Sequence, residues 1–403
     1  MPSRNSISQF LTYSAVIASK SLVGIGTIFI ISLRHHELLA PVIIGQSYGT
    51  ISSALVGMGA PIEASQFLAN TPSDSGKFSI LRVILKRQYL ALLLLISTAL
   101  IFEYLLVEPH HTSTFVVYSF LGFLNNLASG LNLSWWFVAK PDFAVQNRLE
   151  VAVRLLVVGA FLLGGIVFDA PYLYLIGGAL PYFITTIIGK RRENARQEIT
   201  PPVPSFRFGV WFHFLSTIFS SSAVIWASMF ATDLVVQTGL ADRLVKAALL
   251  ASLPISQIFQ HRVLSEKVSL RIRVGLRCLV QSTILALFSS TIFFLTVNPL
   301  SKIFFNVQID TSVSLAFGLI LGLSIVTRSA GIEVLTSIGL SKTIFWSILW
   351  GCLVQLLLVS VLKFGFRHSG FLIAMVVAEL FVLVFKMVRI LKESRKFDSS
   401  LDS

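Results

Sequence analysis

The stretch Lys190–Phe208, KRRENARQEITPPVPSFRF, is the one long segment of the chain whose composition does not suit a lipid environment. It combines five basic residues with Pro201, Pro202 and Pro204. Charge and proline together disfavour a membrane-spanning helix and favour an extended, solvated linker. The segment lies near the middle of a 403-residue chain, between two sequences that resemble each other in composition. The sequence therefore predicts two lobes, 1–189 and 209–403, joined by a cytoplasmic linker at 190–208.

The rest of the chain has the composition of a membrane protein. Hydrophobic residues make up 55% and charged residues 13%, against about a quarter charged in soluble proteins. The mean hydropathy is +0.81. The apolar residues come in blocks of about 20, the length of a membrane-crossing helix. We therefore expect an all-α polytopic membrane protein, with twelve spans in two six-helix lobes. The predicted spans are 10–32, 40–62, 89–107, 114–136, 150–168, 171–189, 210–232, 244–263, 276–297, 312–333, 343–362 and 370–389.

The net charge of +13 has two possible explanations. Either the protein binds nucleic acid, or its basic residues gather on the cytoplasmic side of the membrane. Of the 32 basic residues, 23 fall on one side of the predicted spans, and the largest groups are in the linker, in the loop 262–277 and from Lys386 onwards. The other side holds Arg34, Arg243, Lys246, Lys302, Lys363 and Arg367. Basic residues collect in cytoplasmic segments, so both termini are predicted to be cytoplasmic and no nucleic-acid partner is required.

Two motifs typical of enzymes, a phosphate-binding loop and a metal-binding cluster, are absent from the sequence. The sequence contains no P-loop and no His, Cys, Asp and Glu spacing typical of a metal site, so neither a cofactor nor a metal is expected. Cys278 and Cys352 both lie in apolar blocks. Because each half has six spans, both halves enter the membrane from the same side, as in parallel-repeat transporters. A transporter is therefore expected, rather than an enzyme.

Charged residues inside spans cost about 2.5–3.5 kcal/mol each on insertion, so each needs an explanation. Lys20 lies about ten residues, or roughly 15 Å, inside the first span, too deep for its side chain to reach the headgroups. Tyr13, Lys20 and Thr27 are spaced by seven, which places them on one polar stripe. This stripe predicts contact with protein or with a wet cavity.

The other candidates divide by charge. Arg154 and Arg328 join Lys20 as predicted substrate-binding or translocation residues, although both lie near the cytoplasmic side and could be purely interfacial. Glu63, Glu379 and His213 are candidates for ion coupling. Glu379 lies midway along the last span, and a structural ion pair with Lys20 is the alternative interpretation.

Several segments resemble a known family of transporters. They are the glycine-rich second span with Gly45, Gly49, Gly57 and Gly59, then Leu131–Phe137 (LNLSWWF), Ala247–Gln257 (AALLASLPISQ), Gly331–Leu340, Gly370 and Glu379. Together they resemble the lipopolysaccharide O-antigen flippase group, within the multidrug/oligosaccharidyl-lipid/polysaccharide exporter superfamily. The resemblance covers nearly the whole chain but contains no invariant signature.

The resemblance implies two six-helix lobes in a V, around a central cavity lined by the first, second, seventh and eighth spans. It implies transport of an undecaprenyl-pyrophosphate-linked oligosaccharide across the bacterial inner membrane, for O-antigen or other surface polysaccharide assembly. A polymerase and other assembly proteins would be partners, together with the lipid bilayer. Lys20 would then lie on the cavity wall, where its ammonium suits a pyrophosphate.

Two other functions remain open from the sequence. An O-antigen polymerase would have a similar number of spans, but it would usually carry a long outer loop. A drug/cation antiporter of the same superfamily would share the fold, with a more acidic cavity than the position of Lys20 suggests.

Overall fold

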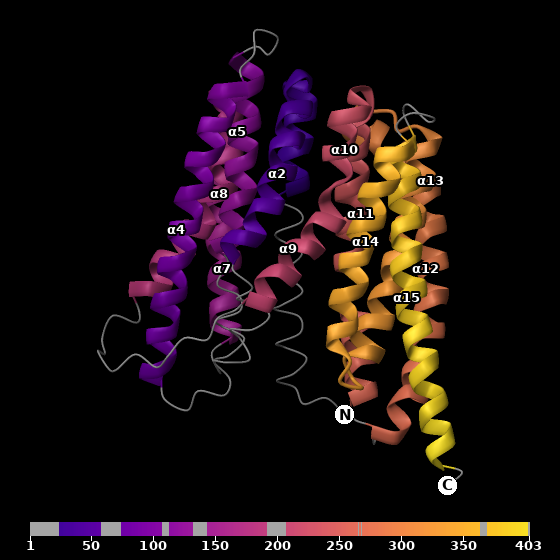
Figure 1. The fold of residues 1–403 in the computed structure, drawn as a ribbon. Coiled ribbons are helices and arrows are strands. Elements are labelled where there is room, and N and C mark those ends of the chain that lie inside the picture. The colour runs from indigo at the N-terminus through magenta and orange to yellow at the C-terminus, as the bar shows by residue number, and fades with distance from the viewer. Residues whose placement is uncertain are drawn as a thin grey trace. The chain divides into compact units, whose positions relative to one another are not determined.

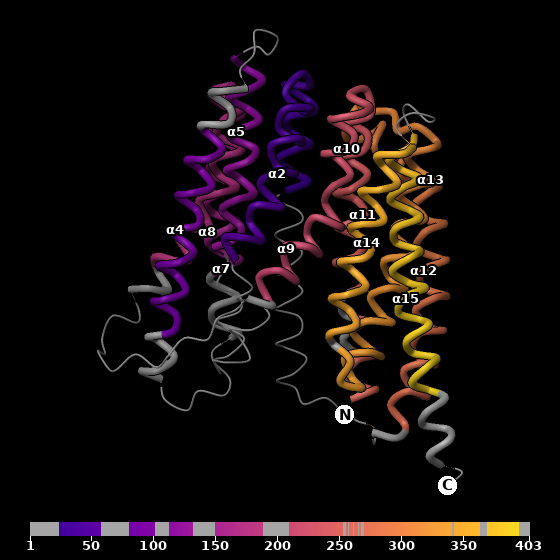
Figure 2. The backbone as a smooth tube through the Cα atoms, in the orientation of Figure 1, coloured from indigo at the N-terminus to yellow at the C-terminus, as the bar shows by residue number. Residues whose placement is uncertain are grey.

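The computed structural model describes residues 24–57, 74–106, 113–131, 143–191, 207–264, 266, 268–362 and 369–401; Figure 1 draws the helices among them as coloured ribbons, and Figure 2 traces the backbone as a tube. Those residues form helices and short connections, with no strand among them. A described helix lies at each of the twelve predicted spans. The chain is an all-α polytopic membrane protein, as predicted from the apolar blocks.

The helices of the first half begin with Gly24–Arg34 and η1 (His36–Leu38), followed by α2 (Leu39–Gly57) and α4 (Asp74–Leu106). Next come α5 (Ser113–Leu127), η3 (Ala128–Leu131), α7 (Phe143–Val167), α8 (Pro171–Arg191) and α9 (Arg207–Ser221). The second half contains α10 (Ala223–Phe230), η4 (Thr232–Leu234), α11 (Val235–Leu264), α12 (Val268–Phe305), α13 (Thr311–Arg328), η5 (Ser329–Leu335), α14 (Ser341–Leu362) and α15 (Gly370–Leu401).

Eight of the described helices are long and apolar enough to cross a membrane. The pair α9 and α10, separated by a break at Ser222, has the length and composition of a ninth span. Large apolar side chains are exposed along these helices, for example Leu156, Phe168 and Leu287. Apolar exposure of this kind is what a lipid environment allows, because lipid tails solvate such side chains.

The chain forms two compact units, Met1–Ser221 and Ser222–Ser403. This division comes one helix later than the predicted linker at 190–208. The reason is that α9, predicted as the first span of the second lobe, packs against α2. The described ends of α8 at Arg191 and of α9 at Arg207 leave the interior of the linker outside the described residues.

Glycines allow α2 and α5 to pack closely in the first unit. A Cβ atom on Gly45 would collide with the backbone carbonyl of Ser119, and one on Gly49 would collide with that of Phe123. On the facing helix, a Cβ on Gly122 would lie 2.6 Å from the carbonyl oxygen of Val42. Small residues four apart let membrane helices approach in this way. More than half of α2 is buried, which explains how this polar, glycine-rich sequence lies within a membrane protein.

The second unit is a bundle in which α13 contacts α11, α12 and α15, and α14 packs on α15 (Figure 1). Its α13 ends in a π-helix, η5, which continues the helix for seven more residues. Arg271 of α12 fastens this region at one end of the bundle. Its guanidinium donates to the carbonyl oxygens of Leu264, Glu266 and Ser337, at 3.2, 3.1 and 3.2 Å. The end of α11, the start of α12 and the chain after η5 are thereby held together.

Candidate functional site: two buried charge clusters

The structure separates the predicted site residues. Arg154 and His213 belong to the first unit, whereas Arg328 and Glu379 belong to the second. Lys20 and Glu63 lie outside the described residues, so their roles stay predictions. Within each unit, the buried charges have partners that we describe in turn.

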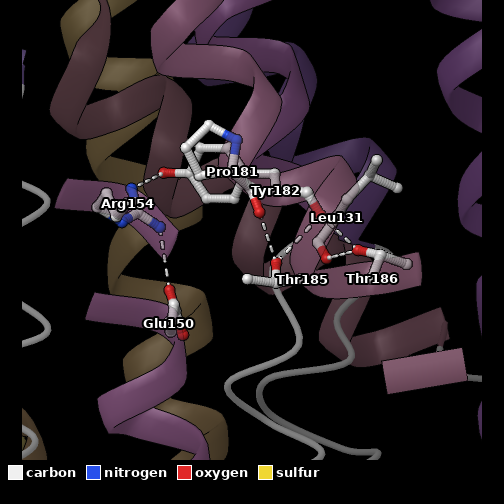
Figure 3. Close-up of polar contacts among 7 residues, drawn as sticks. All are labelled: Leu131, Glu150, Arg154, Pro181, Tyr182, Thr185 and Thr186. Carbon is white, nitrogen blue, oxygen red and sulfur yellow. Dashed lines mark hydrogen bonds and ion pairs between the residues drawn. The ribbon is translucent and has the colours of Figure 1, made fainter. Parts of the chain in front are cut away.

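Arg154 lies between α7 and α8, and its side chain is paired (Figure 3). It is 2% exposed and donates from Nη2 to Oε1 of Glu150 at 3.0 Å, one helical turn earlier on α7. Its Nη1 donates to the hydroxyl of Tyr182 on α8 at 3.2 Å, and the guanidinium carbon lies 4.6 Å from the centre of that ring. The positive charge is therefore neutralised by a carboxylate that is itself 6% exposed. This geometry joins α7 to α8 inside the first unit.

The α8 side of this contact is held by two neighbouring threonines (Figure 3). Thr185 donates to the carbonyl oxygens of Pro181 at 2.8 Å and Tyr182 at 3.1 Å. Thr186 donates to the carbonyl oxygen of Leu131, at the end of η3, at 3.3 Å. Since these bonds fix the turn that carries Tyr182, the partner of Arg154 is positioned by backbone contacts rather than by solvent.

His213 lies on α9, on the side that meets α2. A Cβ atom on Gly57, the last described residue of α2, would lie 3.9 Å from Cδ2 of His213. The backbone carbonyl of His213 accepts hydrogen bonds from Ser216 at 3.0 Å and Thr217 at 2.7 Å. The imidazole thus packs at the end of α2, where an ion-coupling role stays a prediction.

In the second unit, Glu379 and Lys386 lie on one face of α15, seven residues apart. Glu379 accepts a hydrogen bond from Ser324 of α13 at 2.9 Å. Lys386 is 4% exposed and donates from Nζ to the carbonyl oxygen of Thr327, in the last turn of α13, at 3.1 Å. The two charges therefore bond α15 to α13 at two points, Ser324 and Thr327.

The π-helix contributes a further acid to this region. Glu333 is 1% exposed and accepts hydrogen bonds from Ser329 at 2.6 Å and from Ser256 of α11 at 2.9 Å. A Cβ on Gly331 would lie 3.2 Å from Nζ of Lys386, so a glycine here leaves room for the ammonium. Arg328 lies directly before the π-helix, beside this cluster. Glu379 and Lys386 of α15 thus contact α13, whereas Glu333 joins η5 to α11 through Ser256.

The sequence did not predict that Lys386 would be buried, because it was grouped with the basic residues of the cytoplasmic side. The structure buries it because α15 continues as one helix from Gly370 to Leu401, and the face that carries Glu379 is still packed one heptad later. That heptad spacing was the signal that could have identified it. Glu150 was likewise detectable, since it precedes Arg154 by one turn of the same predicted helix.

In chemical terms, the two clusters differ. The first is a neutral ion pair with an aromatic partner. The second has two carboxylates, one ammonium and several hydroxyls within the span regions of α13 and α15, which suits exchange of a proton or a small cation. Among the residues that the structure describes, no group of three or more His, Cys, Asp or Glu side chains is arranged to hold a metal ion.

Comparison with known proteins places the fold. No family model and no curated protein matches the sequence. Solved structures do match over nearly the full length. A Vibrio cholerae MATE transporter aligns with a TM-score of 0.61 at 14% identity, covering 96% of this chain and 97% of its own. An outward-facing MATE multidrug resistance transporter of the MOP superfamily gives 0.59 at 13%, covering 98% and 96%. The lipid II flippase MurJ, in an inward closed conformation, gives 0.56 at 13%, covering 97% and 89%.

These likenesses define the class of fold: the chain has the helical architecture seen in these solved membrane proteins. At 12–16% identity they show architecture alone, and they include both drug transporters and a lipid flippase.

Proposed function

We propose that this protein is a flippase of the bacterial inner membrane that moves a polyprenyl-pyrophosphate-linked oligosaccharide between the leaflets. The observation that carries the proposal is the match of nearly the whole chain to a fold used by transporters, among them a lipid II flippase. The sequence resemblance to O-antigen exporters supports the oligosaccharide part of the substrate. Transport, rather than chemical conversion, is the proposed activity.

A cation inside a predicted span supports an anionic substrate. Lys20 is the proposed pyrophosphate contact, because a lysine that deep in a predicted span needs a polar partner. In the second unit, Glu379 and Lys386 are proposed to take part in coupling transport to an ion gradient. Their partners on α13, the Ser324 hydroxyl for Glu379 and the Thr327 backbone carbonyl for Lys386, are polar groups that a proton or a small cation could use.

Deletion of the gene in its own bacterium tests the proposed function. We expect lipid-linked repeat units to accumulate in the inner leaflet, and mature polymer to be absent from the cell surface. Expression of the wild-type chain should restore both. If single repeat units still reach the outer leaflet while polymer is lost, the protein acts as a polymerase instead. Unchanged polymer together with increased drug sensitivity would favour a drug antiporter.

The proposed role of Lys20 is tested by charge. Lys20→Arg should retain partial transport, because the charge survives while its shape changes. Lys20→Ala should lose most transport and keep normal protein levels, since removing a buried charge relieves an insertion cost. The double variant Lys20→Met with Glu379→Gln separates this role from a structural ion pair. Restored abundance and restored transport in that variant would make Lys20 a scaffold residue.

A further inference from the structure

Three helices of the second unit have an exposed apolar face, of the kind that contacts lipid, with basic residues at one end of it. On α12, Val280, Ile284 and Leu287 are exposed and recur at spacings of three and four, which defines one helix face. The same face continues toward the start of the helix with Arg277 and then Arg273, both exposed. The outward surface of α12 therefore changes from apolar to doubly basic within one turn.

The pattern repeats on α14 and α15. On α14 the exposed face contains Trp346 and Trp350, and the exposed Lys342 precedes Trp346 by one turn. On α15 the exposed Val384 and Val388 are followed, one turn later, by the exposed Lys392. Each helix thus has an apolar outward face with a cation at one end.

On each helix, a stretch about as long as the bilayer core is thick adjoins these cations. Residues 278–297 of α12, which follow Arg277, extend about 30 Å at 1.5 Å per residue. The stretches from Lys342 to Leu362 and from Gly370 to Lys392 are of similar length, roughly 30 and 33 Å. The hydrocarbon core of a bilayer is about 30 Å thick. With the apolar faces in lipid, all four cations reach the level of the headgroups.

The four residues also belong to the same end of the bundle. Arg271 at the start of α12 bonds to the carbonyl of Ser337, which precedes α14. Lys386 in the second half of α15 bonds to Thr327, at the end of α13. The starts of α12 and α14 and the last turns of α15 are therefore neighbours at the end that the charge bias predicts to be cytoplasmic (Figure 1).

The two ends of the unit differ in charge. At this end, the exposed charged side chains among the described residues are all basic: Arg262, Arg273, Arg277, Lys342 and Lys392. Of the nearby acids, Glu393 is only partly exposed and lies 3.7 Å from Arg389. At the opposite end, the exposed Lys302 is accompanied by the exposed Asp233 and Asp310. Among the described residues, a surface whose exposed charges are all positive is therefore found at one end of the second unit and not at the other.

We propose that Arg273, Arg277, Lys342 and Lys392, which we call the basic collar, bind the phosphates of anionic membrane phospholipids. Arg273 and Arg277 are one turn apart, about 6 Å between their Cβ atoms, so both can reach one phosphodiester. The occupant is a lipid rather than a soluble phosphate, because each cation continues a face whose next turns are apolar and exposed. A molecule with a phosphate and acyl chains matches both parts of that surface. This inference does not depend on what the protein transports.

The test compares lipid association of the purified full chain in phosphatidylcholine vesicles. Spin-labelled phosphatidylglycerol and spin-labelled phosphatidylcholine are added as separate probes, and the immobilised fraction of each is measured. The wild-type chain should prefer phosphatidylglycerol several-fold, because each basic residue near a surface contributes about a fivefold gain in affinity for anionic lipid. High salt should reduce this preference. The variant with all four collar residues changed to Gln should lose it.

Matched variants keep the result interpretable. Lys302→Gln removes an exposed lysine at the opposite end and should leave the preference unchanged. The pairs Arg273→Gln with Arg277→Gln, and Lys342→Gln with Lys392→Gln, should each lose part of it, so the test survives if the fourfold variant is unstable. Equal preference in wild-type chain and collar variants would overturn the proposal, as would the absence of any preference in the wild-type chain. Full competition by free glycerol phosphate would also overturn it, since the site would then take a soluble anion.

Discussion

Arg154 and Lys386 are both buried cations, but their charges are balanced in different ways. Arg154 has a carboxylate at 3.0 Å on its own helix. Lys386 has a backbone carbonyl at 3.1 Å, with the acid Glu379 two turns away on the same face. Breaking a buried pair by removing one partner leaves the other charge uncompensated, whereas replacing both can be neutral. We therefore expect substitutions at Arg154 and Lys386, or at their partners, to differ in their effect on stability.

For the first cluster, we expect Glu150→Gln to destabilise the protein by about 3 kcal/mol, because it leaves the Arg154 guanidinium buried without its anion. The double variant Glu150→Leu with Arg154→Met should regain most of that stability. Thermal unfolding of the purified protein in detergent measures both. If the double variant is stable but inactive in transport, the predicted substrate role of Arg154 is supported. Stable and active protein would assign Arg154 to structure alone.

For the second cluster, Lys386→Met should reduce transport strongly, since it removes a buried cation that bonds α15 to the end of α13. Lys302→Met on α12 is the control, and it should transport normally because its side chain is exposed and lies outside the basic collar. Initial transport rates at equal protein abundance provide the comparison. Equal rates in the two variants would contradict a special role for the buried lysine.

At the scale of single residues, the sequence predicted some roles and missed others. Arg154 and Glu379 were singled out because both fall within apolar blocks, although Arg154 could also have been purely interfacial, and the structure buries it beside Glu150. The burial of Lys386 was missed because it lies near the end of the last predicted span, where basic residues usually mark the cytoplasmic side. Whether a lysine at this position is buried depends on how α15 packs against α13. A hydropathy pattern holds no information about that packing.

Among the elements, the contact between α2 and α5 depends most directly on residue size. We expect Gly49→Val to reduce the yield of folded protein severely, at a cost of about 3 kcal/mol or more, because its side chain meets the backbone carbonyl of Phe123. Gly159→Val on α7 is the control, since a Cβ there meets nothing within 4 Å. Monodispersity of the detergent-solubilised protein measures the outcome. Similar losses in both variants would mean that helix propensity, rather than close packing, is responsible.

The elements themselves were largely predictable, because blocks of about 20 apolar residues admit only helices in lipid. Their ends were less so. The helix α12 has 38 residues, roughly 57 Å, where the apolar block predicted 276–297. Its first turns are too basic for a span, and they are helical because Arg271 joins them to α11 and to the chain after η5. Tertiary contacts of this kind are absent from a hydropathy pattern.

For the whole molecule, the sequence predicted helical membrane architecture correctly, and the division into units differs by one helix. A linker at 190–208 was predicted from charge and proline and stays a prediction, whereas α9 packs against α2 of the first unit. From the order of segments in the sequence, a span that follows a linker is expected to belong to the next lobe. The contact of α9 with α2 shows otherwise, and such a contact can be seen only in the folded structure.

The predicted topology can be tested on the whole molecule. Reporter fusions after Ser205 and after Ser394 should both give cytoplasmic signals, because most basic residues fall on that side of the spans. Paired alkaline phosphatase and fluorescent protein fusions distinguish the two compartments. A periplasmic signal at either position would break the twelve-span topology and the relation between its halves.

The π-helix η5 has a consequence for comparing this chain with its relatives. A π-helix bonds residues five apart where an α-helix bonds residues four apart, so it contains the equivalent of one inserted residue. If a relative has a regular α-helix here, the correct alignment contains a one-residue gap within Ser329–Leu335. An ungapped alignment shifts every later position by one, which is about 100° around a helix. Roles copied by number past this point would then fall on the wrong face.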